Sequence, residues 1–426
     1  MAHAKHIKPH ITNMKEQILS NIDNPAQLER LYRTDKPAFT RTFNDLYPQM
    51  EDNLLVRFWN ERLSFTNAAE VNSGRKELLF VVMASFIAGM VAKLPQILGI
   101  AEDVFYQRNA GFIALVPLTA YFAWKNRMPA ARIGAVIILM LIAAVYVNVL
   151  PTGKSDSIVL ACAHLFLFLW SLLGYSFVGD YRNNDQHRLA FLKYNGDLVV
   201  ISTLILIAGG ILTGVTIGLF SLIGFNIEKF YFENIVVFGL PAVPLVGTYL
   251  IESNPQLVGR VSPVIAKIFS PLVLIMLVAY LVAILYSGKD PYNDRDFLLI
   301  FNALLVGVMA IIFFSVAGTS GKEKHYVEIW ILFLLSLLTA VVNGIALSAI
   351  LFRISEWGIT PNRAAVLGGN VLILVNLLTV TAHLSMAIAK KGSLDKVGKA
   401  ISAYLPVYFV WTIVVVFLFP ILFGFK

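Results

Sequence analysis

Charged residues and cysteine are scarce in this chain of 426 residues. Asp, Glu, Lys and Arg make up 14% of the sequence, whereas a soluble globular protein carries about 25%. The single cysteine, Cys162, excludes an intramolecular disulfide framework and a metal cluster held by several cysteines. Hydrophobic residues account for 58%, and the mean hydropathy is +0.72. This composition excludes a water-soluble globular protein and indicates a membrane protein.

Motifs for the common enzyme chemistries are also missing. The chain has no phosphate-binding P-loop, no HExxH zinc motif and no GxSxG nucleophile elbow. His164 and His383 stand alone in apolar runs, and two histidines do not make a metal site, although either could relay protons. No Asp or Glu lies deep in an apolar run, which counts against a proton- or ion-coupled pump. We identify no catalytic residue, no cofactor site and no metal site.

Apolar residues are gathered in runs of about 18 or more, the length needed to cross roughly 30 Å of hydrocarbon as a helix. Strands of an outer-membrane barrel would be about 10 residues long and would alternate in polarity, so a barrel is excluded. We predict an all-α, polytopic transmembrane helix bundle over residues 78–426. The expected spans, about eleven, are 78–98, 109–125, 132–150, 158–178, 198–222, 233–251, 265–286, 297–317, 328–352, 363–389 and 403–424.

Lysine and arginine are distributed unevenly between the two sides of these spans. The N-terminal segment and the loops on its side hold 25 of them, and the opposite side holds 8. Because positive residues accumulate on the cytoplasmic side, the N-terminus is predicted to be cytoplasmic and the C-terminus to lie on the outer side. The net charge of +8 follows this membrane rule, so we expect membrane lipid and no nucleic acid as a partner.

The region before the first span is polar and carries helix signals. We expect a flexible tail and a first short helix over 1–23, then a small cytoplasmic helical domain over 24–77. Two helix starts are predicted at Asn24-Pro25-Ala26-Gln27 and Asp35-Lys36-Pro37. An aromatic stripe on one helical face follows at Phe39, Phe43 and Tyr47. The stripe is either the core of this domain or a groove for a protein partner.

Several segments of this region resemble a known family. They are Asn24-Pro25-Ala26-Gln27-Leu28-Glu29-Arg30-Leu31-Tyr32-Arg33, Phe43-Asn44-Asp45-Leu46-Tyr47-Pro48 and Phe58-Trp59-Asn60-Glu61-Arg62-Leu63. Together with Trp357-Gly358-Ile359-Thr360, they make the chain similar to an uncharacterised bacterial multi-pass membrane family catalogued as domain of unknown function 4153. The resemblance covers most of the chain and implies a protein of the bacterial cytoplasmic (inner) membrane. It supplies no activity and no site residues.

A short polar turn joins the ninth and tenth expected spans. Gly358 suits the left-handed position after a helix, Thr360 suits an N-cap, and Pro361 suits the first helical position. The turn therefore predicts one helix ending and another beginning.

The same turn carries three charged residues, Arg353, Glu356 and Arg363. Arg353 and Glu356 are three residues apart on a helix and can pair. Arg363 lies in the first turn of a helix, whose N-terminus attracts anions. We interpret the three residues either as an anion or lipid-headgroup site or as an interfacial anchor that stiffens the loop.

Small residues at every fourth position predict close helix packing in three spans. They include Gly210, Gly214 and Gly218 in the fifth span, with Gly344 and Gly369 in the ninth and tenth. The ridge in the fifth span either packs against another helix of the chain or forms a homodimer contact.

Amides in the ninth and tenth spans predict an intramembrane polar cluster, because buried amides need partners. Its members are Asn343, Asn370, Asn376 and His383. The cluster either holds helices together or lines a substrate cavity.

Pro241 and Pro244 predict a kink or break in the sixth span, where carbonyl groups without donors could bind a substrate. Three classes of function remain. A transporter or permease is favoured by the broken helix and the asparagines, and a non-enzymatic scaffold or accessory subunit is favoured by the N-terminal domain. A membrane enzyme acting on a lipid-linked substrate comes third, because no nucleophile or base is evident unless Glu356 serves.

Overall fold

We analysed a computed structural model of the chain, which describes residues 8–153, 155–179, 185–223, 225–254, 268–279, 281–282, 295–318 and 326–426. Within these ranges every element is helical and no strand occurs, so the expected all-α class is confirmed for them. The chain divides into two compact units, Met1–Leu79 and Phe80–Lys426. This division falls close to the expected boundary at residue 77.

The first unit is built from short helices. They are α1 (Lys8–Ser20), α2 (Pro25–Thr34), α3 (Lys36–Leu46), η1 (Tyr47–Gln49) and the beginning of α4 (Leu54–Leu98). Both expected helix starts are present. The Asn24 side chain accepts a hydrogen bond from the Gln27 N–H at 3.2 Å, and Asp35 accepts one from the Ala38 N–H at 3.1 Å. Each cap satisfies a backbone donor that has no partner inside its helix.

The aromatic stripe of α3 lies in the core of the first unit. Phe39 and Phe43 are fully buried, and both contact Trp59 of α4. The core consists of Met14, Ile18, Leu28, Tyr32, Phe39, Phe43, Leu46, Val56, Trp59 and Leu63. Because Phe39 and Phe43 have no exposed surface, they do not form a groove for a partner.

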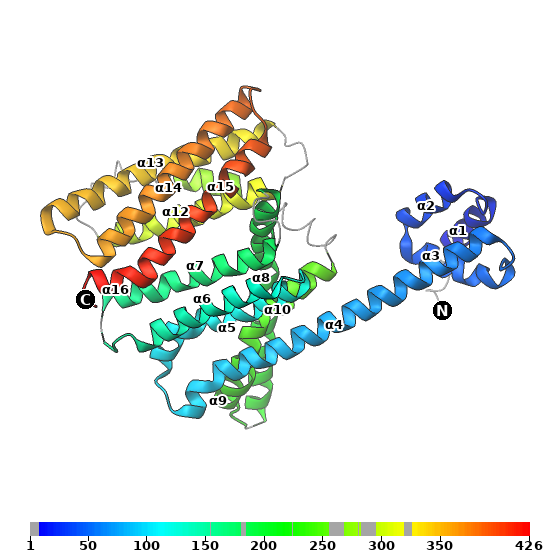
Figure 1. Ribbon diagram of the computed structural model, residues 1–426, viewed down its shortest axis with the longest axis horizontal. Coiled ribbons are helices and arrows are strands. Elements are labelled where there is room, and N and C mark those ends of the chain that lie inside the picture. Colours follow the sequence, from blue (N-terminus) through cyan, green and yellow to red (C-terminus); the bar gives the residue numbers. More distant parts are fainter. Residues whose placement is uncertain are drawn as a thin grey trace. The chain divides into compact units, whose positions relative to one another are not determined.

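The second unit contains the apolar helices (Figure 1). They are α5 (Glu102–Lys125), α6 (Ala130–Val149), α7 (Asp156–Val178), α8 (Asp185–Leu222), α9 (Glu228–Tyr231), the π-helical η2 (Phe232–Val236), α10 (Val237–Ser253), the helix Ile268–Ala279, α12 (Arg295–Ala317), α13 (Tyr326–Trp357), α14 (Pro361–Ile388), α15 (Leu394–Ile413), the π-helical η3 (Val414–Leu418) and α16 (Phe419–Leu422).

Eight helices of the described residues are long and apolar enough to cross a membrane. They are Gly74–Leu98, Ala130–Val149, Asp156–Val178, Asp185–Leu222, Glu228–Ser253, Tyr326–Trp357, Pro361–Ile388 and Leu394–Leu422. The other expected spans overlap α5 and two shorter apolar helices, Ile268–Ala279 and Phe301–Ala317. Residues 265–267, 280 and 283–286 of the expected span 265–286 lie outside the described residues. The fold is thus that of a multi-helix membrane protein, while the count of eleven spans stays a prediction.

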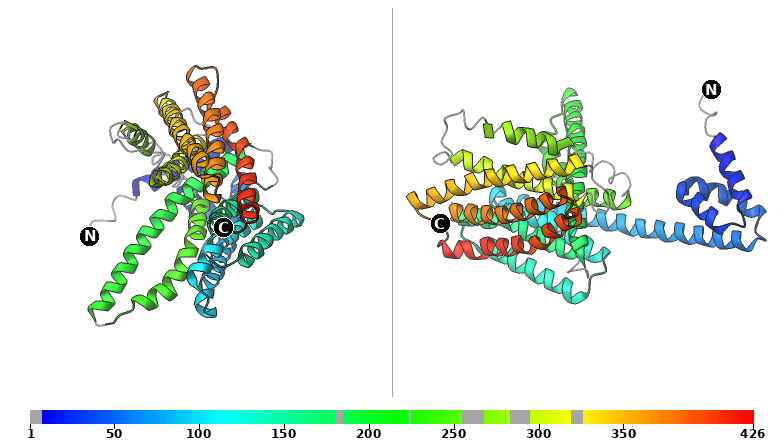
Figure 2. Two further views of the ribbon diagram at one scale, coloured as in Figure 1. Left: turned by 90° about the vertical axis from the view of Figure 1, so that its left-hand side faces the viewer. Right: turned by 90° about the horizontal axis from the view of Figure 1, so that it is seen from above.

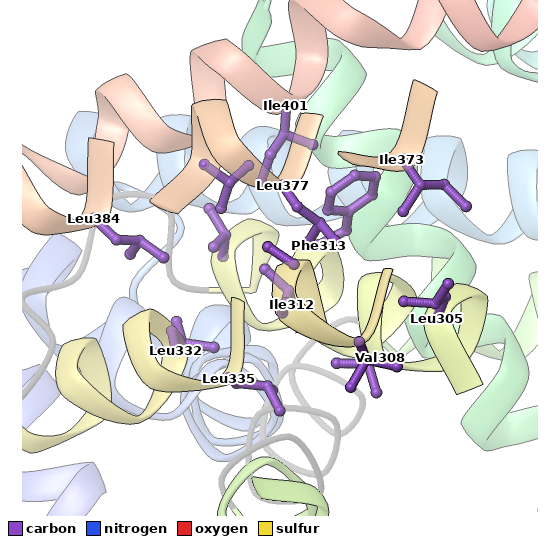
Figure 3. Packing of buried hydrophobic residues seen from close by; sticks show 14 of the residues in the cluster. Leu305, Val308, Ile312, Phe313, Leu332, Leu335, Ile373, Leu377, Leu384 and Ile401 are labelled. Atoms are coloured by element: carbon purple, nitrogen blue, oxygen red, sulfur yellow. The ribbon is translucent and has the colours of Figure 1, made fainter. Parts of the chain in front are cut away.

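Helices α12, α13, α14 and α15 share one apolar core (Figure 3). Figure 3 shows Ile312 and Phe313 of α12 between Leu335 of α13 and Leu377 of α14. A second core joins α5, α6, α7 and the first part of α8. Trp170 of α7 packs against both cores, and it lines a pocket together with residues of α6, α8 and α15.

The second half of α8 stands away from both cores together with α9 and the start of α10 (Figure 2, left). Gly210, Gly214 and Gly218 are exposed there, and a Cβ built on any of them meets no atom of the described chain within 4 Å. The helix contact predicted at this ridge is therefore not made by any described residue of the chain, and a contact with a second copy stays a prediction. Lipid tails are as apolar as leucine, so a small-residue pattern permits a close helix contact without enforcing one.

Gly344 and Gly369 likewise have no neighbour within 4 Å of a built Cβ among the described residues, so the predicted close packing at these positions is also wrong. Other glycines take that role. A Cβ on Gly368 of α14 would overlap the Trp411 ring of α15, and one on Gly196 of α8 would overlap Phe314 of α12. The tight helix contacts therefore form at glycines outside the predicted ridges.

Helix α10 continues through Pro241 and Pro244, so a break at these positions is wrong, whereas the alternative of a kink stays a prediction. Each proline removes one hydrogen-bond donor, and the remaining bonds of a membrane helix suffice to keep it helical. The irregular turn lies just before, in η2, where the Val237 N–H donates to the Phe232 carbonyl five residues back.

Candidate functional site

The turn between α13 and α14 has the predicted backbone. Gly358 adopts φ +75°, and its N–H donates to the Ile354 carbonyl at 2.9 Å. The Thr360 side chain caps α14 by accepting from the Arg363 N–H at 3.3 Å, and Pro361 is the first helical residue. All three predicted roles are confirmed.

The charges of this turn are arranged differently from the prediction. Arg363 donates to the carbonyl groups of Trp357 at 2.9 Å and Gly358 at 2.7 Å. The guanidinium groups of Arg353 and Arg363 lie 5.8 Å and 5.6 Å from the Trp357 ring centroid. Glu356 is exposed, and none of the ion pairs in the described part of the chain includes it. The predicted pairing of Arg353 with Glu356 is therefore wrong, and Arg363 closes the end of α13.

The amides of α13 and α14 form two separate groups. Asn343 donates to the Asn370 carbonyl at 3.0 Å, and Asn370 donates to the Asn302 side chain of α12 at 2.9 Å. Asn376 instead donates to the Tyr408 hydroxyl of α15 at 2.9 Å. These bonds cross-link four helices inside an apolar core, which supports the structural interpretation of the amides.

His383 belongs to neither amide group in the described structure. It is half-buried, and its Nδ1 is a buried nitrogen without a hydrogen-bond partner there. The predicted four-residue cluster is therefore split into parts.

A pocket of about 540 Å³ lies where α6, α7, α8 and α15 meet. This volume is within the range of small-molecule sites. Most of its wall is apolar, with contributions from Leu139, Leu172, Phe191, Leu405 and Phe409. Its polar and aromatic-polar lining consists of Trp170, Ser171, Tyr175 and Arg188.

Arg188 of α8 is positioned by a proline of α15. Pro406 has no N–H, so the Ser402 carbonyl four residues earlier lacks its usual helical donor. The Arg188 Nη1 donates to this carbonyl at 3.3 Å. Pro406 and Arg188 both line the pocket. Pro406 thus lines the pocket and leaves free the Ser402 carbonyl that accepts the hydrogen bond from Arg188.

Further polar contacts fix α15 on the first turns of α8. The Ser402 hydroxyl donates to Asp185 at 3.0 Å, and Lys399 lies 3.9 Å from the same carboxylate. On the pocket wall, the Trp170 indole N–H donates to Asn195 at 2.8 Å. A guanidinium group held at one side of an apolar pocket can bind an anion whose remainder is apolar.

From the sequence alone, Arg188 is only one of the positive residues in the loops on the N-terminal side of the expected spans. Its partner Ser402 is 214 residues away, and no local pattern connects the two. The available signal was Pro406, because a proline inside a helix releases the carbonyl four residues before it.

Among the described residues, no group of three or more His, Cys, Asp or Glu side chains could hold a metal ion. Comparisons of the chain with protein-family models, with curated proteins and with solved structures found no match. The evidence for a binding site at this pocket therefore comes from its volume and its lining residues alone.

Proposed function

We propose that this protein is a permease-type membrane protein that takes an amphipathic anion from the membrane into the pocket between α6, α7, α8 and α15. The observation that carries the proposal is the combination of a largely apolar wall with one arginine held against it. The apolar wall suits an acyl chain, and the guanidinium group suits a phosphate or carboxylate headgroup.

The proposed orientation agrees with this ligand. Arg188 belongs to the loop region that the charge distribution assigns to the cytoplasmic side. The cytoplasmic leaflet is rich in anionic lipids. We further propose that the chain resides in a bacterial cytoplasmic membrane, with the N-terminus inside and the C-terminus outside, and that it belongs to the family it resembles.

A pocket-blocking variant tests the proposal. Ala135 lines the pocket on α6, whereas Ile138 of the same helix is 57% exposed and is not part of the lining. Wild-type protein and the variants Ala135→Phe and Ile138→Phe are reconstituted in vesicles with fluorescent phosphatidylglycerol, and its movement between leaflets is followed by quenching. We expect wild type and Ile138→Phe to accelerate this movement and Ala135→Phe to lose the effect.

Native mass spectrometry of the same three proteins measures bound phosphatidylglycerol directly. We expect wild type and Ile138→Phe to retain the lipid and Ala135→Phe to lose it. Equal binding and equal movement in all three proteins would refute the pocket as the site.

A scaffold role is the second candidate, favoured by one observation on the first unit. Leu54 and Phe58 lie one turn apart on α4 and are 67% and 63% exposed. Such an apolar pair on a polar unit fits a protein partner. A photo-crosslinking residue at position 58 should capture a defined protein in cells, and one at exposed Glu61 should not. Equal labelling from both positions would count against this role.

A further inference from the structure

Two basic residues of this protein occupy backbone positions that favour glycine. Three non-glycine residues of the described chain have a positive φ, Arg127 at +48°, Lys390 at +57° and Phe425 at +60°. In this conformation a Cβ crowds the neighbouring carbonyl oxygen, so glycine, and to a lesser degree asparagine, is preferred there. A long basic side chain held at such a position, at a cost to the backbone, points to a function of that side chain.

Arg127 and Lys390 each follow the end of a long apolar helix, α5 and α14 respectively. At both ends the N–H of the basic residue donates to the carbonyl three residues back, and the next N–H donates to the carbonyl five residues back. This is the bonding of a Schellman motif, whose left-handed residue is usually glycine. Glycine does hold the positive φ after α4, α7 and α13, at Gly99, Gly179 and Gly358. The chain thus places a basic residue at two helix ends where glycine would be less strained.

The positive charges at these two ends are available to a partner. Arg127, Lys390 and the adjacent Lys391 are exposed, and none of them has an ion pair or a side-chain hydrogen bond to another described residue. Lys125, two residues before Arg127, differs, because it pairs with Glu252 at 2.7 Å.

The position of both ends suits contact with lipid headgroups. In the predicted topology both lie on the side of the N-terminal segment. Trp124, one turn before Arg127, is 44% exposed, and tryptophan prefers the headgroup level of a membrane. Lys390 and Lys391 come directly after α14, which is long and apolar enough to span the membrane. Basic residues at the end of a spanning helix attract anionic lipids.

We propose that the ends of α5 and α14 bind anionic phospholipid headgroups, with Arg127, Lys390 and Lys391 donating hydrogen bonds to the phosphate oxygens. Guanidinium and ammonium groups form strong, charge-assisted hydrogen bonds with phosphate. The inference goes beyond the proposed function and does not depend on the pocket, because none of the three residues lines it.

Asparagine substitutions test this contact in the full-length protein, because asparagine is uncharged and tolerates the left-handed conformation. The proteins are wild type, Arg127→Asn, Lys390→Asn, and a combined variant that adds Lys391→Gln to both. Lys229→Gln is the control for net charge, since Lys229 is exposed and lies 3.7 Å from Glu233 on the opposite side of the predicted topology. Thermal midpoints are measured in neutral detergent with phosphatidylglycerol, with phosphatidylcholine, or with sodium phosphate and no lipid.

We expect phosphatidylglycerol to raise the midpoint of wild type and of Lys229→Gln above the value in phosphatidylcholine. The combined variant should lose about half of this rise or more, because each basic residue near an anionic surface contributes a similar share. The rise should also shrink between about 0.1 M and about 1 M sodium chloride, where the Debye length falls from about 10 Å to about 3 Å. In phosphatidylcholine the asparagine variants should unfold no earlier than wild type, because the strain at positions 127 and 390 is reduced.

An equal rise with phosphatidylglycerol in wild type and in the combined variant would overturn the inference. A loss of midpoint that is the same in both lipids would also overturn it, because the basic residues would then act only on the carbonyl ends of their own helices. If sodium phosphate alone gave the full rise, the site would take a free phosphate ion and the lipid contact would be refuted.

The same measurement on Ala135→Phe separates this inference from the proposed function. The pocket-blocking variant keeps Arg127, Lys390 and Lys391, so the part of the rise that these residues supply should remain. A rise that disappears in Ala135→Phe and persists in the combined variant would assign lipid binding to the pocket and refute the contact at the helix ends.

Discussion

The contact between Gly368 of α14 and Trp411 of α15 gives a sharp test of how these helices pack. Two glycines stand side by side in α14, Gly368 and Gly369. A Cβ on Gly368 would overlap the Trp411 ring, whereas one on Gly369 meets no atom of the described chain within 4 Å. Because both residues occupy the interior of the same helix, Gly→Ala brings the same gain in helix propensity at each, about 1 kcal/mol. The difference between the two variants isolates the packing term.

We expect Gly369→Ala to raise the unfolding free energy by up to about 1 kcal/mol. Gly368→Ala adds an overpacking cost of about 1–3 kcal/mol, because the rigid indole ring must move away. The two variants should therefore differ by about 1–3 kcal/mol, with Gly368→Ala the less stable. Thermal unfolding in detergent, followed by circular dichroism, measures the difference as a shift of about 1–3 °C between the two midpoints.

A double-mutant cycle with Trp411→Leu assigns the effect to the ring. In this background the smaller side chain leaves room for the Cβ, so Gly368→Ala should lose most of its cost. Equal midpoints for Gly368→Ala and Gly369→Ala in the wild-type background would refute the reasoning and would favour the ridge predicted at Gly369.

Gly358→Ala should destabilise the α13–α14 turn by about 1 kcal/mol, because its φ of +75° strains any residue with a Cβ; thermal unfolding beside Gly344→Ala, which meets no neighbour, checks this. In the first unit, the Arg33 guanidinium lowers the pKa of the Glu29 carboxyl below its ordinary 4.5. The stabilisation of the folded first unit by this ion pair is complete at pH values above 4.5. It is lost as the pH falls through the lowered pKa of Glu29 in the folded state. Glu29→Gln should remove less than about 1 kcal/mol at neutral pH and nothing in strong acid, as measured by hydrogen exchange of α2.

Local features of the chain were predicted well. Asn24, Asp35 and Thr360 cap helices as expected, and Gly358 and Pro361 take their expected places in the α13–α14 turn. Each of these roles depends on residues within a few positions along the chain, so the sequence around it contains the whole interaction.

Features that depend on distant segments were predicted poorly. The ridge at Gly210, Gly214 and Gly218 is exposed, while Gly368 and Gly196 make the close contacts. The amides of Asn343 and Asn376, predicted to form one cluster, instead find partners on different helices, Asn370 of α14 and Tyr408 of α15. A helix pattern shows which residues share a face and does not show which helix covers that face.

The sequence by itself determined that this is an α-helical membrane protein and where many of its helices begin and end. Only the tertiary structure decided that Arg188 meets the carbonyl released by Pro406, and that Asp197 is buried with one oxygen unmatched. The physical reason is that lipid and protein interior are about equally apolar, so hydropathy marks a helix as membrane-embedded without telling which of its faces other helices cover. Polar partners supply that information, and they come from segments far apart in the chain.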